Sequence, residues 1–269
     1  MSKKGSYFAN HRKRIGTENE PVERRRSEPL TEAKKLEFEE GKVILLDKPL
    51  HWTSFDAVKK VRNAIRIKKV GHAGTLDPLA SGLLIICTGK FTKKINEYMA
   101  AEKEYTGTFT LGAVTPTYDL ESDATDFKDT SHLSVDEIHA ATQAFVGQIQ
   151  QMPPLYSAIK KEGVALYTLA RRGKEVTLEP REIFIKQFSI TAIEMPVVTF
   201  NVVCSTGTYI RSLAHDFGAA LGCGAYLSAL RRTRIGDFTV DESVSIDAFL
   251  DSLQEVKKPE DASEPDSSL

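Results

Sequence analysis

Cysteine is scarce in this chain of 269 residues, which holds only Cys87, Cys204 and Cys223. Three scattered thiols do not form the dense, even set from which small secreted domains build a disulfide framework. No apolar run approaches the roughly 20 residues that span a bilayer, and the basic N-terminus lacks the apolar segment of a secretory signal. We therefore expect a protein of the cytoplasm with reduced thiols and no membrane attachment.

Sequence signatures for metals and nucleotides are missing as well. None of the six histidines lies at ligand spacing beside a cluster of cysteines or carboxylates. No glycine-rich loop ends in Lys-Ser or Lys-Thr, and no dinucleotide fingerprint occurs. The Gly-x-Ser-x-Gly turn that carries the nucleophile of many serine hydrolases is missing too. A Ser-His-Asp triad in another chain order has no fixed spacing, so the sequence leaves that alternative open. We predict no metal and no cofactor.

The small net charge of −1 hides an uneven distribution along the chain. Residues 241–269 carry two basic and nine acidic side chains, a net charge of −7, whereas residues 41–240 carry 24 basic and 20 acidic side chains, a net charge of +4. The body of the protein is therefore mildly basic. That charge permits a polyanionic partner without proving one.

The composition divides the chain into three parts. Residues 1–38 are polar and charged with little apolar periodicity, which predicts a flexible arm. Its clusters "HRKR" and "ERRR" either contact phosphates or are simply solvated. Residues 39–240 are expected to form one folded domain, and residues 241–269 a short acidic tail in which "SIDAFL" forms at most one short helix.

Hydrophobic periodicity within the body indicates both strands and helices. They do not alternate as βαβ units, so we predict an α+β fold with a mixed but largely antiparallel central sheet flanked by helices and loops. We expect strands at 42–49, 82–89, 104–112, 181–194 and 197–207. We expect helices at 55–66, N-capped by Ser54, at 134–147, opened by a Ser134–Glu137 capping box, at 165–173, and at 209–222, ended by glycine.

The helix at 55–66 is amphipathic and basic. Phe55, Val58, Val61 and Ile65 fall on one face, which should be buried. The other face should present a basic surface that either contacts phosphates of a polyanionic partner or is only solvated. With the residues that follow the helix, this basic set is Lys59, Lys60, Arg62, Arg66, Lys68 and Lys69.

A single carboxylate, Asp77, stands in the glycine-punctuated stretch "VGHAGTLDPLASGLL" at residues 70–84. Pro78 restricts Asp77 to extended backbone, and Gly74 and Gly82 permit tight turns on either side. Such a loop would display the carboxylate rigidly for chemistry that uses neither metal nor cofactor. An aspartate in a turn also commonly accepts hydrogen bonds from local amides. The spacing by itself does not separate these two interpretations.

The segment "KVGHAGTLDPLASGLL" resembles the aspartate motif of the TruB family, the pseudouridine synthases that modify the TΨC loop of tRNA. Four other segments resemble family signatures in the family's order: "LLDKPLHWTSFDAVKKVR", "EKEYTGTFTLGAVTPTYDLESD", "QQMPPLYSAIKKEGVALYTLARRG" and "CSTGTYIRSLAHDFGAALGCGAYLSALRRTRIGDF". The resemblance spans residues 41–240. It implies the pseudouridine synthase fold and an isomerase that converts uridine 55 of tRNA to pseudouridine. Because isomerisation gains and loses no atoms, that activity needs no cofactor.

The resemblance also implies roles for individual residues. Asp77 would be the catalytic carboxylate, and Arg211 in "GTYIRS" would favour its ionised form and fix its direction. The target uridine must be flipped into the pocket, where Tyr105 would stack on it and Tyr209 would exchange protons. The sequence leaves open whether Asp77 attacks the ribose, attacks the base or takes a proton from the sugar.

Further residues are implied to surround the site. Leu230 would close the pocket, His72 would fill the space that the flipped nucleotide leaves, and Lys48 of the Lys-Pro segment would line the site in a role that is either functional or purely structural. Beside the pocket wall, three arginines of "LRRTRIG" would contact the RNA backbone. These are Arg231, Arg232 and Arg234.

The chain departs from the family pattern in places. His51 stands where the Lys-Pro segment usually carries glycine, which tolerates positive φ better than histidine does. Ala73 and Ser81 stand where threonine is more common. Only 29 residues follow Val240, too few for the C-terminal RNA-binding PUA domain of many members, so we expect no such domain.

Two other functions compete with a stand-alone tRNA pseudouridine synthase. One is a guide-RNA-dependent synthase of the related dyskerin branch, which depends on partner proteins and on the C-terminal domain. The other is an RNA-binding protein without catalysis. Asp77 together with Tyr105, Tyr209 and Arg211 favours an enzyme, because binding alone needs no such set. We expect a monomer that requires no protein partner.

Overall fold

The computed structural model describes residues 30–157, 160–161, 164–165 and 178–254. The described strands are β1 (Val43–Lys48), β2 (Val70–Ala73), β3 (Ala80–Thr88), β4 (Lys103–Leu111), β5 (Gly147–Gln151), β6 (Lys160–Lys161), β7 (Val164–Ala165), β8 (Arg181–Glu194), β9 (Val197–Cys204), β10 (Ala225–Ile235) and β11 (Phe238–Thr239). The described α-helices are α2 (Glu32–Glu40), α3 (Ser54–Ile65), α4 (Ile95–Ala100), α5 (Val135–Ala141), α7 (Ile210–Ala220) and α8 (Ile246–Ser252). Three 3₁₀ segments accompany them, η1 (Gly89–Lys94), η2 (Thr142–Phe145) and η3 (Val240–Glu242).

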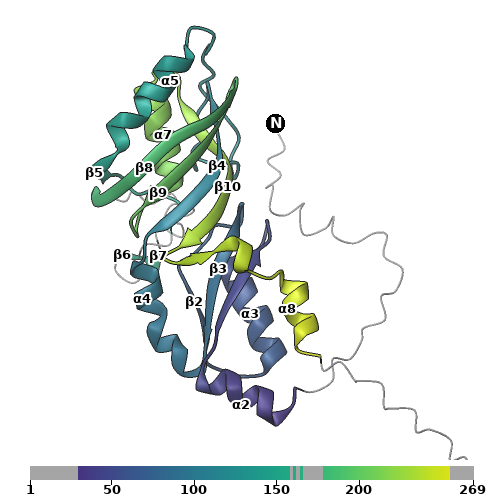
Figure 1. Cartoon of the computed structure of the whole chain (residues 1–269). Coiled ribbons are helices and arrows are strands. Elements are labelled where there is room, and N and C mark those ends of the chain that lie inside the picture. The colour runs from purple at the N-terminus through teal and green to yellow at the C-terminus, as the bar shows by residue number, and fades with distance from the viewer. Residues whose placement is uncertain (1–29, 158–159, 162–163, 166–177, 255–269) are drawn as a thin grey trace, which may run out of the picture.

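Nine strands form one sheet with the main order β1-β3-β10-β4-β9-β8-β5, while β2 pairs with β3 and β11 with β10. Among these pairs, β3 and β10 run parallel and the rest run antiparallel. Figure 1 shows the sheet passing through an elongated molecule, with β1, β2 and β3 in the lower half and β4, β5, β8 and β9 in the upper half. The predicted α+β fold with a mixed, largely antiparallel sheet is confirmed.

Strand β10 joins the two halves. Along most of its length it pairs with β4, and over Leu230–Arg232 it pairs with Ala80–Gly82 of β3. This crossing depends on Gly82, whose φ is 102°. A Cβ atom there would lie 2.3 Å from the carbonyl oxygen of Arg232, so only glycine allows the two strands to approach this closely.

In the lower half, β3 is buried on both faces. Leu84 and Ile86 point into a cluster formed with β1, α2, α3 and α8. Leu83 and Ile85 point into a second cluster on the other face, which α4 and β11 cover. A strand covered on both sides reads as a continuous apolar run, which explains why "GLLIICTG" predicted it well.

In the upper half, α5 and α7 pack on one face of the curved sheet (Figure 1). The core there is aromatic: the rings of Phe109 and Phe200 stack with centroids 4.2 Å apart, and Phe188 packs edge-on against Phe217 of α7. These large rings hold α7 firmly against β4, β8 and β9. α7 begins at Ile210, so Arg211 lies in its first turn.

Two details of α3 differ from the prediction. The N-cap is Thr53 rather than Ser54, because Thr53 and Asp56 form the capping box and Ser54 is the first helical residue. Phe55 was expected on the buried face, but it is 61% exposed. Ala57 takes that place because the buried stripe runs through Ala57, Val58, Val61 and Ile65, and the helical period puts Phe55 outside it.

Folded structure extends beyond the predicted boundaries of the body at both ends. α2 lies partly within the expected arm, since Phe38 is buried in the lower core and contacts the Phe249 ring edge-on. α8, N-capped by Ser245, contributes buried Ile246 and Phe249 to the same cluster, so the expected tail begins with a packed helix. Most of the predicted arm and tail, and nearly all of the predicted helix at 165–173, lie outside the described residues.

The other predicted elements lie close to their expected bounds. β8 has the predicted limits. The helix expected at 134–147 begins with the Ser134–Glu137 capping box, but it ends at Ala141 and continues as the 3₁₀ segment η2. Within the described residues, no helix is long and apolar enough to cross a membrane.

Candidate active site

The loop that carries Asp77 is fixed by its backbone on both sides of that residue. The Ser54 hydroxyl accepts a hydrogen bond from the Leu76 N–H at 2.8 Å and lies 3.2 Å from the Leu76 carbonyl oxygen. The carbonyl of Pro78 accepts a hydrogen bond from the His51 N–H at 2.7 Å. Anchors at positions 76 and 78 fix the backbone on both sides of Asp77 and leave its side chain available to the site.

The Asp77 carboxylate faces a buried guanidinium. Nε of Arg211, on the first turn of α7, lies 2.9 Å from Oδ2 of Asp77 and 3.6 Å from Oδ2 of Asp119. The other guanidinium nitrogens of Arg211 donate to the carbonyl of Tyr156 at 3.1 Å, so its orientation is fixed. The pairing of Asp77 with Arg211 that we expected is present, and the Asp77 side chain stays 41% exposed while that of Arg211 is buried.

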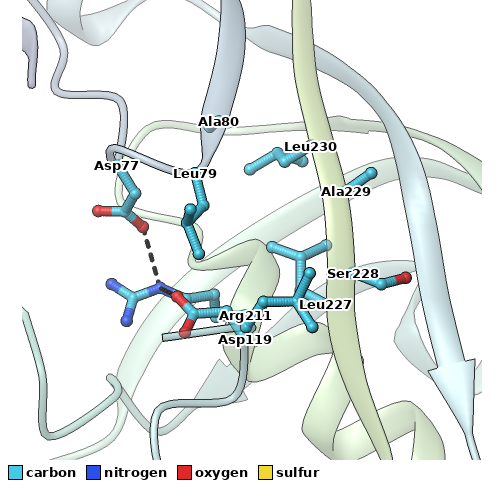
Figure 2. Close-up of a pocket in the computed structure, with 10 residues that line it drawn as sticks. Asp77, Leu79, Ala80, Asp119, Arg211, Leu227, Ser228, Ala229 and Leu230 are labelled. Atoms are coloured by element: carbon cyan, nitrogen blue, oxygen red, sulfur yellow. Dashed lines mark ion pairs between the residues drawn. The ribbon is translucent and has the colours of Figure 1, made fainter. Parts of the chain in front are cut away.

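A small cavity opens beside this ion pair at the junction of the two halves. Figure 2 shows the Asp77 carboxylate and the Arg211 guanidinium on one side of it, and side chains from the Leu79 turn and from β10 on the other. The cavity measures about 20 Å³, room for about one water molecule. Its apolar lining is Leu79, Ala80, Leu120, Leu227, Ala229 and Leu230.

Asp119 is a site residue that we did not single out in the sequence. It lies in the loop after β4, is 4% exposed, lines the same cavity and accepts a hydrogen bond from the Glu121 N–H at 2.9 Å. Burial raises the pKa of its carboxyl, although the hydroxyl of Thr117 and the charge of Arg211 oppose that shift. Its only sequence signal was its place within "TPTYDLESD", a run of common turn residues.

The two expected tyrosines lie near Asp77 but are not among the described residues that line the cavity. Tyr105 is buried on β4 between Val202 of β9 and Arg232 of β10, and Tyr209 is the N-cap residue of α7. Burial is the largest cause that raises the pKa of both phenols, and the negative charge of Asp77 adds to it. Both phenols are therefore protonated at neutral pH, within electrostatic reach of the aspartate.

Lys48 supports the site from below and does not face solvent. Its side chain is fully buried, and Nζ donates to the carbonyls of Pro49 and Trp52 at 3.0 and 2.7 Å. Both hydrogen bonds close the turn that carries His51. In this arrangement Lys48 therefore has a structural role and does not reach a surface that RNA could contact. His51 itself has a φ of 65°, so the position where the family usually carries glycine does adopt the left-handed conformation.

The arginines of β10, expected to contact the RNA backbone, all have partners within the protein. Arg232 is 1% exposed and donates to the carbonyls of Leu83 and Gly74, so it braces the aspartate loop. Arg231 forms a two-bond ion pair with Asp47. Arg234 pairs with two acids that precede and follow Lys103. Each guanidinium is held by carboxylates or carbonyls of the sheet, which sequence spacing does not reveal.

The remaining predicted residues are spread more widely. Leu230 lines the cavity as expected. His72 lies on β2 opposite Ile86, and burial together with the charge of Arg232 lowers the pKa of its imidazole, so the ring is neutral at pH 7. The basic set is exposed except for half-buried Arg62. Three members, Arg66, Lys68 and Lys69, follow the C-terminal end of α3. The aspartate loop contacts Ser54 at the N-terminal end, so these three lie roughly 18 Å along the helix from that loop.

The site can therefore present one fixed carboxylate and an apolar wall to a flat, uncharged group, with two protonated phenols nearby. Among the described residues, no three histidine, cysteine, aspartate or glutamate side chains converge as ligands of a metal ion would. A carboxylate held by a guanidinium beside a desolvated pocket is suited to act as a nucleophile or a base.

Comparison with known proteins places this geometry in a family. Residues 62–210 match the model of the TruB family pseudouridylate synthase N-terminal domain, and residues 211–269 match that of the tRNA pseudouridylate synthase B C-terminal domain. The chain is 52% identical to tRNA pseudouridine synthase B of Flavobacterium johnsoniae over 225 residues, which cover 81% of this chain and 98% of that relative. Its counterpart in Chloroherpeton thalassium is 46% identical over 80% of this chain and 91% of that relative.

Solved structures agree. The fold matches a chain in the crystal structure of a Cbf5-Nop10-Gar1 complex with a TM-score of 0.64 and 33% identity, over 81% of this chain and 56% of that one. It matches a chain of an H/ACA RNP bound to a substrate RNA containing 2′-deoxyuridine with a TM-score of 0.61 and 30% identity, over 81% and 54% of the two chains. The chain thus spans little more than half the length of these solved relatives. The chain belongs to the TruB family of pseudouridylate synthases.

Proposed function

We propose that this protein isomerises uridine 55 in the TΨC loop of tRNA to pseudouridine, with Asp77 as the catalytic carboxylate. The observation that carries the proposal is the Asp77–Arg211 ion pair of 2.9 Å, formed at the edge of an apolar cavity by a backbone anchored on both sides. The names of the relatives, tRNA pseudouridine synthase B, support tRNA as the substrate.

The reaction sets clear demands on such a site. The bond between N1 of the base and C1′ of the ribose breaks, a bond between C5 and C1′ forms, a proton leaves C5 and N1 gains one. Asp77 supplies the negative charge next to the bond that breaks, and Arg211 fixes the direction of the carboxylate. Because their phenols stay protonated, Tyr105 and Tyr209 can donate hydrogen bonds to the base while it turns.

The cavity must enlarge before a base can enter. A volume of about 20 Å³ holds one water molecule rather than a uracil ring. The apolar wall of the cavity includes Leu120, which is 51% exposed and follows Asp119 in the loop after β4. We expect this side chain to move aside when the flipped uridine enters, while Leu230 remains part of the cavity wall on β10.

The face around the aspartate loop is suited to RNA. Lys59 and Lys60 are exposed along α3, in position to contact phosphates. Phe55 is exposed on the first turn of the same helix, next to the Ser54–Leu76 contact, and offers a ring on which an unstacked base can lie. Changing Lys59 and Lys60 to glutamine should weaken tRNA binding and flatten its salt dependence, but should leave the single-turnover rate at saturating enzyme unchanged.

The decisive experiment uses an unmodified tRNA transcript with tritium at C5 of uridine. The wild-type chain should release tritium to water, while Asp77→Asn should release none and should still bind the transcript, because the amide keeps the shape and removes the charge. Asp77→Asn turnover at the wild-type rate would remove Asp77 from its role. If the wild-type chain binds the transcript tightly but releases no tritium, the alternative of an RNA-binding protein without catalysis is supported and the proposed function is wrong.

We further propose that the chain acts in the cytoplasm as a monomer, without guide RNA or protein partner. The test is the same assay with purified chain and transcript alone, combined with light scattering on the sample. Activity that appears only after addition of RNA or protein from a cell extract would contradict this part of the proposal.

A further inference from the structure

The short segment that carries Asp119 is held in an unusual conformation. Tyr118, the residue before it, has a φ of 63°, in the left-handed region that tyrosine seldom adopts. Its carbonyl accepts a hydrogen bond from the Leu227 N–H at 2.9 Å, and Asp119 forms an isolated bridge with Leu227. The segment is therefore fixed to β10 on one side, next to the wall of the cavity.

On its other side, the same segment meets α7 through a pair of rings. The Tyr118 phenol and the His215 imidazole stack with centroids 4.1 Å apart and planes inclined by 17°. His215 lies four residues after Arg211, so the two side chains share one face of α7. α7 thus contacts the segment at two neighbouring positions, through the charge of Arg211 on Asp119 and through the ring of His215 on Tyr118.

This arrangement connects the ring pair with the reaction. Nε of Arg211 lies between two carboxylates, 2.9 Å from that of Asp77 and 3.6 Å from that of Asp119. A shift of Asp119 changes the balance of the two attractions and hence the direction in which Arg211 holds Asp77. Because left-handed backbone at tyrosine is costly, Tyr118 needs contacts that keep it there. The backbone hydrogen bond from Leu227 is one of them, and the His215 ring is the contact that holds the side chain.

We propose that the Tyr118–His215 stack is a positioning device for the reaction: it holds the Asp119 carboxylate beside Arg211 and thereby fixes the Asp77 carboxylate. The inference rests on the proposed role of Asp77. His215 is not among the described residues that line the cavity, so its effect on Asp77 passes through Asp119 and Arg211. The flat face of the ring, stacked on Tyr118, carries this role.

The test compares His215→Ala, which removes the stack, with His215→Phe, which keeps a flat ring. We expect His215→Ala to lower the single-turnover rate about tenfold with a change of less than twofold in the dissociation constant for tRNA, and His215→Phe to restore at least half of the rate. Tyr98→Ala, which breaks the remote ring pair of Tyr98 and Phe238, serves as the control for a general loss of stability. It should leave the rate unchanged.

A double-mutant cycle separates positioning from a purely structural role. If His215 acts through Asp119, adding His215→Ala to Asp119→Asn should lower the rate less than twofold further. If the two changes multiply as independent effects, the proposal is wrong. Equal rates for His215→Ala and wild type would overturn it as well.

A spectroscopic signal keeps this test apart from that of the proposed function. The N–H resonance of Arg211 Nε, assigned with Arg211→Lys, reports the two carboxylates whether or not the protein is active. His215→Ala should shift this resonance, and His215→Phe and Tyr98→Ala should not. An unshifted resonance in His215→Ala would refute the positioning role, whereas an inactive wild type would refute the proposed function alone.

Discussion

Replacing Lys48 with methionine should change how stability depends on pH. Methionine has a similar length and no charge, so it tests what it costs to bury an ammonium group below the aspartate loop. Nζ of Lys48 is enclosed and donates to the carbonyls of Pro49 and Trp52. Burial lowers the pKa of Lys48 from 10.5 to about 8, although the nearby charge of Asp77 opposes the shift.

The direction of the effect follows from proton binding. Below pH 8 the lysine is protonated in both the folded and the unfolded chain, and the folded state bears the full cost of the buried charge. Between pH 8 and 10.5 the folded chain has lost a proton that the unfolded chain keeps, so this group makes stability rise with pH. The difference between the two pKa values corresponds to about 3 kcal/mol of unfolding free energy.

Urea unfolding of the wild type and of Lys48→Met at pH 7, 8, 9 and 10 measures this effect. The two lost hydrogen bonds should lower the stability of the variant by a similar amount at every pH. The free energy of unfolding of wild type, minus that of the variant, should therefore rise by about 2–3 kcal/mol between pH 7 and pH 10. Lys103→Met should show the same rise, since burial also lowers the pKa of Lys103 to about 8.

Parallel stability curves for the wild type and Lys48→Met across this range would refute the reasoning. They would mean that water reaches Nζ or that the turn rearranges to release it. A fall with pH would show that attraction to Asp77, and not burial, dominates the environment of Lys48.

Three further changes test other parts of the site. Arg211→Met should destabilise the fold by about 3–5 kcal/mol in urea unfolding, because it leaves the buried Asp119 carboxylate without its cation; a loss below about 1 kcal/mol would argue against that pairing. Asp119→Asn should lower the rate of tritium release, yet at pH 7 it should melt no lower than wild type. Because the folded-state pKa of Asp119 is raised, its contribution to stability falls as pH rises, and the gap should close toward pH 4. Tyr105→Leu should keep the fold, checked by circular dichroism, but slow the reaction about a hundredfold; an unchanged rate would exclude the phenol.

Local patterns in the sequence predicted much of the fold. Alternating and continuous apolar runs predicted the limits of β8 to the residue and those of β3 and β9 to within two or three residues. The Ser134–Glu137 capping box located the start of α5. Strand β10 was not predicted, although it lies inside the sheet between β3 and β4. Its segment "ALRRTRI" shows no apolar alternation, because positions that are partly or wholly buried carry Arg231 and Arg232. The partners of these arginines come from β1, β3 and the aspartate loop.

The candidate site divides in the same way. The pairing of Asp77 with Arg211 followed from the resemblance to a family and is present in the structure. Asp119 was missed because a carboxylate in a polar loop gains importance only when tertiary packing buries it against Arg211. Lys48 and Arg232 were assigned to the site or to RNA, since sequence alone does not distinguish a solvated cation from one enclosed by carbonyls.

The path of β10 bears on how the enzyme opens. One continuous strand belongs to both halves, so they do not move apart as two domains joined by a flexible linker do. The pairing of β10 with β4 is interrupted at two bulges. One lies between Leu227 and Ala229, within the stretch that lines the cavity, and the other lies between Arg232 and Arg234, beyond that stretch. Bulges bend a strand where regular pairing would stiffen it. We therefore expect β10 to bend at these two bulges when a nucleotide enters the site.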